Sequence, residues 1–361
     1  MKITFPHLGD AHRFVGLLMK EIGIEIVVPP LNSRINLEQG IAVSPEEICL
    51  PFKLMIGNLL QAWEMGADTA VMPATMGPCR LGEFAELFNS ILLKCGCNYE
   101  WIVLDSPQAI GLTETLSRLS KVVRERNVPM VSVLVKLNRV KRLVYDLDKL
   151  DSKVRWLAGY VEQPSTCKYA LRRCRTELSS AQTIKEAQKV IRQCSKELDE
   201  LPLRNAEPIK LILTGEIYSL IEPFANHHIE EILMDLGVSV RKRVTIGWWI
   251  NHTFSEAIQF GKEKNQNPYL TNNVGGYAKE TIAESFDSIA EGFDGVIQIL
   301  PIGCMPEIVA KSVLGRMSTD MNLKTLTIIF DEMDGEAGYV TRIEAFVDML
   351  ERRKNGLFFG S

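Results

Sequence analysis

One stretch decides the fold, and it reads Gly295-Val-Ile-Gln-Ile-Leu-Pro-Ile-Gly-Cys-Met-Pro306. Its first six residues are almost wholly apolar, which indicates a strand buried on both faces. A glycine and a cysteine follow in a turn, and Pro306 predicts the first turn of a helix. A buried strand that runs through a turn into a helix is typical of a parallel sheet covered by helices.

The same alternation of strand and helix surrounds this stretch and recurs near the start of the sequence. We expect strands in the second half at Lys210–Thr214, Val238–Val244, Gly295–Leu300 and Thr325–Phe330. In the first part we expect strands at Lys2–Pro6, Ile24–Pro29, Thr69–Pro73 and Tyr99–Asp105. Between them, from about Thr113 to Leu201, charged residues with helical spacing predict a helical segment. In that segment we interpret Val131–Val135 as helical and Ser179–Glu200 as one amphipathic helix.

The two α/β regions repeat each other. Gly66-Ala-Asp68, an apolar strand and Gly77-Pro-Cys79 correspond in order to Gly292-Phe-Asp294, an apolar strand and Gly303-Cys304. The sequence therefore predicts an α/β protein with two similar parallel-sheet domains, flavodoxin- or Rossmann-like, and a helical insert between them. We place the first domain at 1–112, the helical segment at 113–205 and the second domain at 206–361.

The composition is that of an ordinary globular protein. The 361 residues are 46% hydrophobic and 24% charged, and the net charge of −4 gives no basis for nucleic-acid binding. No apolar run approaches the ~18 residues that a membrane span needs, and the first residues lack the pattern of a signal peptide. We therefore expect a cytoplasmic protein without a nucleic-acid or membrane partner, in which the eight cysteines are reduced.

Three of these cysteines share one context, because each directly precedes a predicted helix. Cys49 and Cys304 are both followed two residues later by proline, and Cys79 follows a strand and a glycine turn. The start of a helix favours a negative charge and lowers the pKa of a thiol. Cys79 and Cys304 also follow the carboxyl ends of strands, where α/β sheets bind ligands. We predict that Cys49, Cys79 and Cys304 converge on one metal centre.

Three thiolates suit a [4Fe–4S] cluster with one iron left without a cysteine ligand. Zinc is the competing metal, but structural zinc normally takes four protein ligands. Inert buried thiols are the third alternative. The other cysteines lie at a helix end, at Cys95 and Cys97, or in the helical segment, at Cys167, Cys174 and Cys194, so we expect packing roles for them.

The motifs around the three cysteines resemble those of the 2-hydroxyacyl-CoA dehydratase superfamily, which includes benzoyl-CoA reductase subunits and double-cubane cluster proteins. The motifs are Glu47-Ile-Cys49-Leu-Pro-Phe-Lys53, Gly77-Pro-Cys79-Arg-Leu-Gly-Glu-Phe84 and Gly303-Cys304-Met-Pro-Glu307. Gly215-Glu-Ile-Tyr218 and Thr341-Arg-Ile-Glu-Ala-Phe346 resemble the branch named after "CoA-substrate-specific enzyme activase".

The resemblance implies a redox enzyme component, dehydratase-like and anaerobic, that reduces a small or CoA-linked substrate. Its electrons would come from an ATP-hydrolysing activase with its own iron–sulfur cluster. This chain has no G-x-x-x-x-G-K-[ST] loop and would be the acceptor. The resemblance also implies a homodimer or a heterodimer with a homologous subunit, and a double-cubane [8Fe–9S] cluster as the alternative cofactor. A non-catalytic electron-transfer or cluster-holding subunit and a zinc-stabilised binding module are the rival functions.

Three further residues are candidates for the site. Lys53 and Arg80 lie close in sequence to the proposed ligands and suit an anionic cluster or substrate, or a solvated helix start. Glu216 follows a strand in a glycine turn and is a candidate proton donor, or else a helix cap or ion-paired carboxylate.

Overall fold

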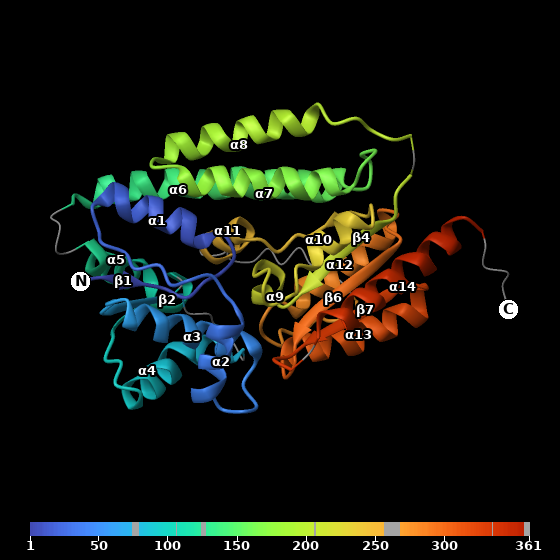
Figure 1. The fold of residues 1–361 in the computed structure, drawn as a ribbon. Helices are drawn as coiled ribbons and strands as arrows, with labels where there is room; N and C mark the ends of the chain where they lie inside the picture. Colours follow the sequence, from blue (N-terminus) through green and yellow to red (C-terminus); the bar gives the residue numbers. More distant parts are fainter. Residues whose placement is uncertain are drawn as a thin grey trace. The chain divides into compact units, whose positions relative to one another are not determined.

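The computed structural model describes residues 1–73, 79–105, 107–123, 128–205, 207–255, 268–333 and 335–356. It is a mixed α/β structure with two parallel sheets and many helices (Figure 1). The chain divides into two compact units. The first comprises Met1–Tyr145, Gln182–Glu186 and Ile246–Glu263, and the second comprises Asp146–Ala181, Ala187–Thr245 and Lys264–Ser361.

The sheet of the first unit has three parallel strands in the order β1-β2-β3. They span Ile3–Thr4, Thr69–Pro73 and Glu100–Leu104. The predicted strand at Ile24–Pro29 is reduced to one parallel bridge, from Ile26 to Ile3. Its last hydrogen bond runs from the Val27 N–H to the Ile3 carbonyl, at 2.8 Å. Two prolines follow at positions 29 and 30, and because proline has no N–H the ladder stops there.

The helices of the first unit alternate with these strands. They are α1 (Ala11–Ile22), α2 (Arg34–Val43), α3 (Leu50–Glu64), the short 3-10 helix η1 (Arg80–Glu83), α4 (Phe84–Lys94), α5 (Pro107–Val123) and α11 (Ile246–Ser255). Helix α6 (Met130–Leu157) begins in the first unit and ends in the second. It contains Val131–Val135, so the helical prediction for that segment is confirmed.

The sheet of the second unit has four parallel strands in the order β5-β4-β6-β7. They span Lys210–Gly215 (β4), Ser239–Arg241 (β5), Gly295–Pro301 (β6) and Thr325–Phe330 (β7). All seven residues of β6 are buried, as the apolar run predicts. Strand order reverses between β4 and β6, since the chain moves from β4 to one side and then to the other.

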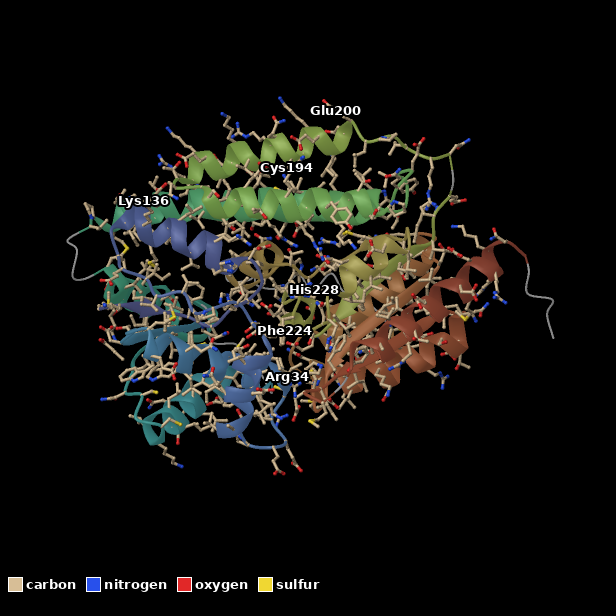
Figure 2. All side chains as sticks on the ribbon, in the orientation of Figure 1. Arg34, Lys136, Cys194, Glu200, Phe224 and His228 are labelled. Atoms are coloured by element: carbon tan, nitrogen blue, oxygen red, sulfur yellow. The ribbon has the colours of Figure 1, made fainter. Side chains whose placement is uncertain are left out.

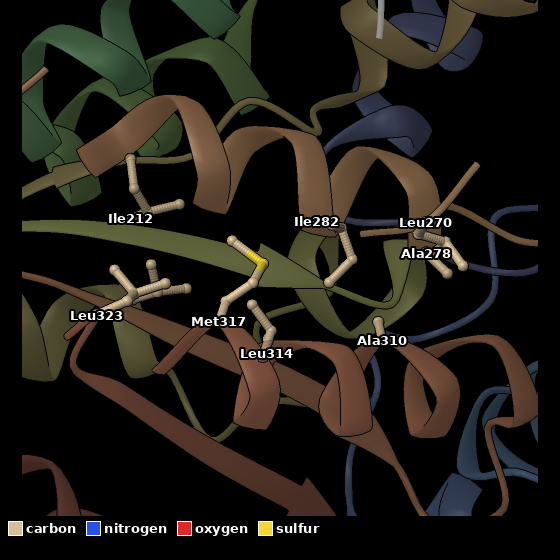
Figure 3. Packing of buried hydrophobic residues seen from close by; sticks show 9 residues of the cluster. Ile212, Leu270, Ala278, Ile282, Ala310, Leu314, Met317 and Leu323 are labelled. Atoms are coloured by element: carbon tan, nitrogen blue, oxygen red, sulfur yellow. The ribbon is translucent and has the colours of Figure 1, made fainter. Parts of the chain in front are cut away.

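Helices α7 (Ser165–Ser180), most of α8 (Ile184–Asp199), α9 (Ile217–Ile221), α10 (Ile229–Asp235), α12 (Ala278–Ala290), α13 (Met305–Met321) and α14 (Glu336–Lys354) complete the second unit. Side chains from β4, β6, α12 and α13 form one buried cluster, so α12 and α13 cover the same face of the sheet (Figure 3). Ile282 on α12 and Leu314 and Met317 on α13 meet Ile212 of β4 there. No described helix is both long and apolar enough to cross a membrane.

The predicted single helix at Ser179–Glu200 is wrong, because the chain breaks between α7 and α8. The Thr183 hydroxyl accepts a hydrogen bond from the Glu186 N–H at 3.2 Å. The Glu186 carboxylate in turn accepts one from the Gln182 N–H at 2.8 Å. This reciprocal pair satisfies one amide in the first turn of α8 and one just before the helix, and so starts a new helix.

Each of the two sheets contains the same kind of anchoring contact. In the first sheet it is made by Asp68, which precedes β2, and in the second by Asp294, which precedes β6. The Asp68 carboxylate accepts from the Lys2 N–H at 2.8 Å, and the Asp294 carboxylate accepts from the Lys210 N–H at the same distance. Each aspartate also donates its own N–H to the carbonyl of that lysine, at 3.1 and 2.9 Å. Both contacts hold the first residue of one strand against the start of its parallel neighbour.

Helices α2 and α3 pack through two glycines that bring their backbones into contact. A methyl group on Gly40 would lie 1.8 Å from the Lys53 carbonyl oxygen, and one on Gly57 would lie 2.0 Å from the Asn36 carbonyl oxygen. The Asn36 amide also donates to the Leu54 carbonyl at 3.0 Å. This close packing fixes the position of α3, whose first turn follows Cys49.

We expect Gly40→Ala to destabilise the protein by about 1–3 kcal/mol, because the added methyl must push the two helices apart. Gly16→Ala in α1 is the matched control, since a methyl there meets nothing within 4 Å. It should stabilise by about 0.5–1 kcal/mol through the lower entropy of the unfolded chain. Urea unfolding of both variants measures the difference, and equal effects of the two would contradict the packing described.

Candidate functional site

Each of the three cysteines occupies the position just before a helix, as the sequence predicts. Cys49 precedes α3, Cys79 precedes η1 and Cys304 precedes α13. All three have extended backbone angles there, which is the usual geometry of a residue that starts a helix. Proline occupies one of the first two positions of α3 and of α13. The predicted turn residues Gly77 and Pro78 lie outside the described residues.

The helix starts give these thiols a common environment. Cys49 and Cys79 are partly buried and Cys304 is 9% exposed. The carbonyls of Cys49 and Cys304 accept the first hydrogen bonds of α3 and α13, at 3.0 Å from the Phe52 N–H and 2.9 Å from the Ile308 N–H. The positive ends of the two longer helices, α3 and α13, favour a negative charge at the residue that precedes each of them.

Lys53 and Arg80 bind the same short loop, which lies just before Cys49. The Lys53 ammonium donates to the Glu46 carbonyl at 3.0 Å, and the Arg80 guanidinium donates to the Glu47 carbonyl at 3.4 Å. Lys53 is only 2% exposed, whereas Arg80 is exposed. Because Arg80 directly follows Cys79, its contact with Glu47 brings the two cysteine-bearing segments of the first unit together.

Cys49 and Cys79 belong to the first unit and Cys304 belongs to the second. The convergence of all three therefore depends on how the two units meet and stays a prediction. In the part of the chain that the structure describes, no three His, Cys, Asp or Glu side chains lie close enough together to hold a metal ion by themselves.

The remaining cysteines have a different chemistry. Cys97, Cys167, Cys174 and Cys194 are buried, and burial raises the pKa of each thiol, that of Cys167 to about 11. Cys194 lies on the side of α8 that faces α7 and contacts the Cys174 thiol (Figure 2). Cys95 is exposed at the end of α4. Buried thiols of this kind pack as small apolar side chains.

Glu216 is the cap of α9. Its carboxylate accepts hydrogen bonds from the Tyr218 N–H at 2.9 Å and from the Ser219 N–H and hydroxyl, both at 2.8 Å. Burial raises the pKa of Glu216, although these hydrogen bonds oppose the rise. The sequence left three roles open for Glu216: proton donor, helix cap or ion-paired carboxylate. The structure shows a helix cap at the carboxyl end of β4, and the role as a proton donor stays a prediction.

Glu307 is a candidate site residue that sequence reasoning included only as the end of the Cys304 motif, without a role. It lies in the first turn of α13, three residues after Cys304, and is 1% exposed. The Gln298 amide donates to its carboxylate at 2.8 Å, and the Thr281 hydroxyl contacts both carboxylate oxygens at 3.1 and 3.2 Å. Burial, aided by repulsion from Glu216 and Glu280, raises the pKa of Glu307 to about 7 against these hydrogen bonds. A buried carboxyl that titrates near neutral pH at the ligand-binding edge of a sheet is typical of functional sites.

These features define a mixed α/β protein with parallel sheets and chemically distinctive residues at their carboxyl edges. The chain belongs to the family described as CoA enzyme activase uncharacterised domain (DUF2229), whose model matches residues 7–243. The matched region contains Cys49, Cys79 and Glu216, whereas Cys304 and Glu307 follow it. No curated protein matches the chain.

The raised pKa of Glu307 makes the stability of the protein depend on pH in a defined direction. The neutral carboxyl is favoured in the folded state, so its contribution is complete below pH 4.5, the ordinary value, and is lost as pH rises to about 7. Glu307→Gln stays neutral throughout. Relative to wild type it should therefore gain about 3 kcal/mol between pH 4.5 and pH 8, from about 1.4 kcal/mol for each pKa unit.

Urea unfolding at the two pH values measures this gain. Glu351→Gln, at an exposed position of α14, is the matched control and should show none. A Glu307→Gln difference that is the same at pH 4.5 and pH 8 would show that folding does not raise the pKa of Glu307.

Proposed function

We propose that this chain is an iron–sulfur redox component in which Cys49, Cys79 and Cys304 hold a [4Fe–4S] cluster. The observation that carries the proposal is the position shared by the three thiols, each directly before a helix. Two of them, Cys79 and Cys304, also follow the carboxyl ends of strands β2 and β6. A repeated environment that stabilises thiolates is the chemistry that an iron–sulfur cluster requires of its ligands.

The donor set fits such a cluster better than it fits zinc. A structural zinc site normally has four protein ligands, and the sequence supplies three cysteines in the shared context. The buried thiols of Cys97, Cys167, Cys174 and Cys194 are poor candidates for a fourth ligand, because burial raises the pKa of each. With three thiolates, one iron keeps a position for another ligand.

We further propose that the two units contain two similar flavodoxin-like domains. When the segment at Ile26 is counted as a strand, the strands of the first sheet lie side by side in the order 2-1-3-4, numbered along the chain. The strands β4 to β7 of the second sheet have the same order when numbered in the same way. This is the strand order of the flavodoxin-like class. The anchoring contacts of Asp68 and Asp294 support the same correspondence. It makes Cys79 and Cys304 equivalent, since each follows the third strand of its sheet.

The residues around the cysteines then have separate roles. Lys53 and Arg80 hold the Glu46–Glu47 loop, which sets the position of Cys49 relative to Cys79. When bound, the cluster supplies low-potential one-electron chemistry. The positive ends of α3 and α13 favour the negative charge of their thiolates.

The partner that we propose is an ATP-hydrolysing activase with its own iron–sulfur cluster, which delivers electrons for the reduction of a small or CoA-linked substrate. This assignment rests on the resemblance of the cysteine motifs. The chain also lacks the G-x-x-x-x-G-K-[ST] loop that an ATPase of the P-loop class uses, whereas the family description names a CoA enzyme activase without identifying a partner. A homodimer, or a heterodimer with a homologous subunit, is part of the same proposal.

Single serine substitutions test the ligand set. Cys49→Ser, Cys79→Ser and Cys304→Ser should each lower the iron bound after anaerobic purification by about tenfold or more, since even residues that only support metal ligands contribute tenfold. Cys194→Ser is the matched control and should retain its iron, because Cys194 packs between helices. Full iron retention in all three ligand variants would exclude this site.

A further inference from the structure

A row of buried hydrogen bonds surrounds the Glu307 carboxyl in the second unit. On one side the Thr214 hydroxyl of β4 donates to the Thr281 hydroxyl of α12 at 3.3 Å, and Thr281 contacts Glu307. On the other side the Thr327 hydroxyl of β7 donates to the Gln298 side-chain oxygen at 3.1 Å. That bond turns the amide nitrogen of Gln298 toward Glu307, where it donates at 2.8 Å. Four elements of the fold therefore fix one carboxyl.

All of the groups that hold Glu307 are neutral. In the part of the chain that the structure describes, its partners are an amide and a hydroxyl, and it forms no ion pair. A buried carboxylate without a cation is costly, whereas the neutral acid can remain in place and keep its hydrogen bonds.

The charged groups of the packed elements add to this cost. Glu216, between β4 and α9, and Glu280 on α12 both repel a charge on Glu307. Glu284, also on α12, is 2% exposed, and Arg241 of β5 lies 3.7 Å from it. Strands β6 and β7 present neutral Gln298 and Thr327, and on α13 itself Lys311 is exposed to solvent.

The position of Glu307 relates it to the proposed cluster. Cys304 directly precedes α13, and Glu307 follows it by three residues in the first turn of that helix, so less than one helical turn separates the two along the chain. A negative charge added near Cys304 therefore acts on a carboxyl that is only 1% exposed, and charges interact more strongly at buried groups than in water. Protonation of the Glu307 carboxylate would neutralise that added charge.

We propose that Glu307 holds the proton that accompanies electron transfer at the site beside Cys304. When one electron arrives from a low-potential one-electron donor, the Glu307 carboxylate binds one proton from water, and the net charge of the site is unchanged. The O–H bond that forms breaks again when the electron leaves. This inference rests on the proposed function, because the electron must reach a group held by Cys304.

The first test uses the protein without metal and follows carboxylic acids by infrared spectroscopy. Wild type should show a C=O band of a protonated acid that disappears as pH rises through neutrality, and Glu307→Gln should lack it. Glu284→Gln is the matched control. Burial raises the pKa of Glu284 to about 8, so this second buried carboxyl of the same unit gives a C=O band of its own, and the variant should lose that band while it keeps the band of Glu307. Thr281→Val should move its titration to higher pH, because a hydrogen bond to the charged form is lost. Identical spectra of wild type and Glu307→Gln from pH 5 to pH 9 would overturn the assignment.

The second test uses the iron-loaded protein and measures its midpoint potential at pH 6, 7 and 8. In wild type the potential should shift with pH by up to about 59 mV for each tenfold change in proton concentration, the value for a one-electron couple. In Glu307→Gln the shift should be lost while the iron content is retained. A wild-type potential that is constant over this range would overturn the coupling alone. Failure of wild type to bind iron would overturn the proposed function and the coupling with it, whereas the infrared band would still assign the proton to Glu307.

Discussion

The parallel pairing of β4 with β6 is the constraint on which the second unit depends. At its carboxyl end the Glu216 N–H donates to the Ile299 carbonyl at 2.9 Å. The strands approach so closely there that a methyl group on Gly215 would lie 1.9 Å from the same carbonyl oxygen, and Gly215 has a φ of 137°. Only glycine suits both conditions. As a result the cap of α9 and the start of α13, with Cys304 and Glu307, follow neighbouring strands at one sheet edge.

Two glutamates of the second unit, Glu230 and Glu307, have different surroundings. Their comparison distinguishes a structural role from a functional one. Burial alone would raise the pKa of Glu230, but Lys242 and Arg155 lower it to about 2. Lys242 and Arg155 both form ion pairs with Glu230, the latter at 3.0 Å. Glu307 is more deeply buried, at 1% exposed against 17% for the Glu230 side chain, and its hydrogen-bond partners are neutral. The ion-paired carboxylate of Glu230 links α6, α10 and the end of β5. Glu307 has only neutral partners among the described residues and lies at the carboxyl edge of the sheet, where ligands bind.

The sequence predicts the strands and the helix starts well, because both depend on local residues. Apolar runs identify the core strands, and a proline two residues after Cys49 and Cys304 identifies the helices that follow. The break between α7 and α8 also had a local signal, Thr183 followed three residues later by Glu186, which the helical spacing of the surrounding residues concealed. The pairing at Ile26 is short because of two prolines, Pro29 and Pro30. Their effect on the hydrogen-bond ladder depends on where the neighbouring strand ends.

The environment of Glu307 was not predictable from the sequence in the same way. Its burial depends on Thr281 and Gln298, which are distant in sequence and reach it only because α12 packs beside α13 and β6 lies beneath them. For Glu216 the sequence left three roles open, and the hydrogen bonds from Tyr218 and Ser219 identify a helix cap. Burial and partners of charged side chains are properties of the tertiary structure, whereas helix starts are largely local.

Quantification of iron and acid-labile sulfide in protein purified without oxygen tests the central claim most directly. A single cluster held by Cys49, Cys79 and Cys304 predicts about four irons and about four sulfides for each chain, with the absorption spectrum of an iron–sulfur protein. About eight irons would replace the single cluster by a double cubane. Colourless protein that contains zinc or no metal, and no sulfide, would contradict the iron–sulfur assignment.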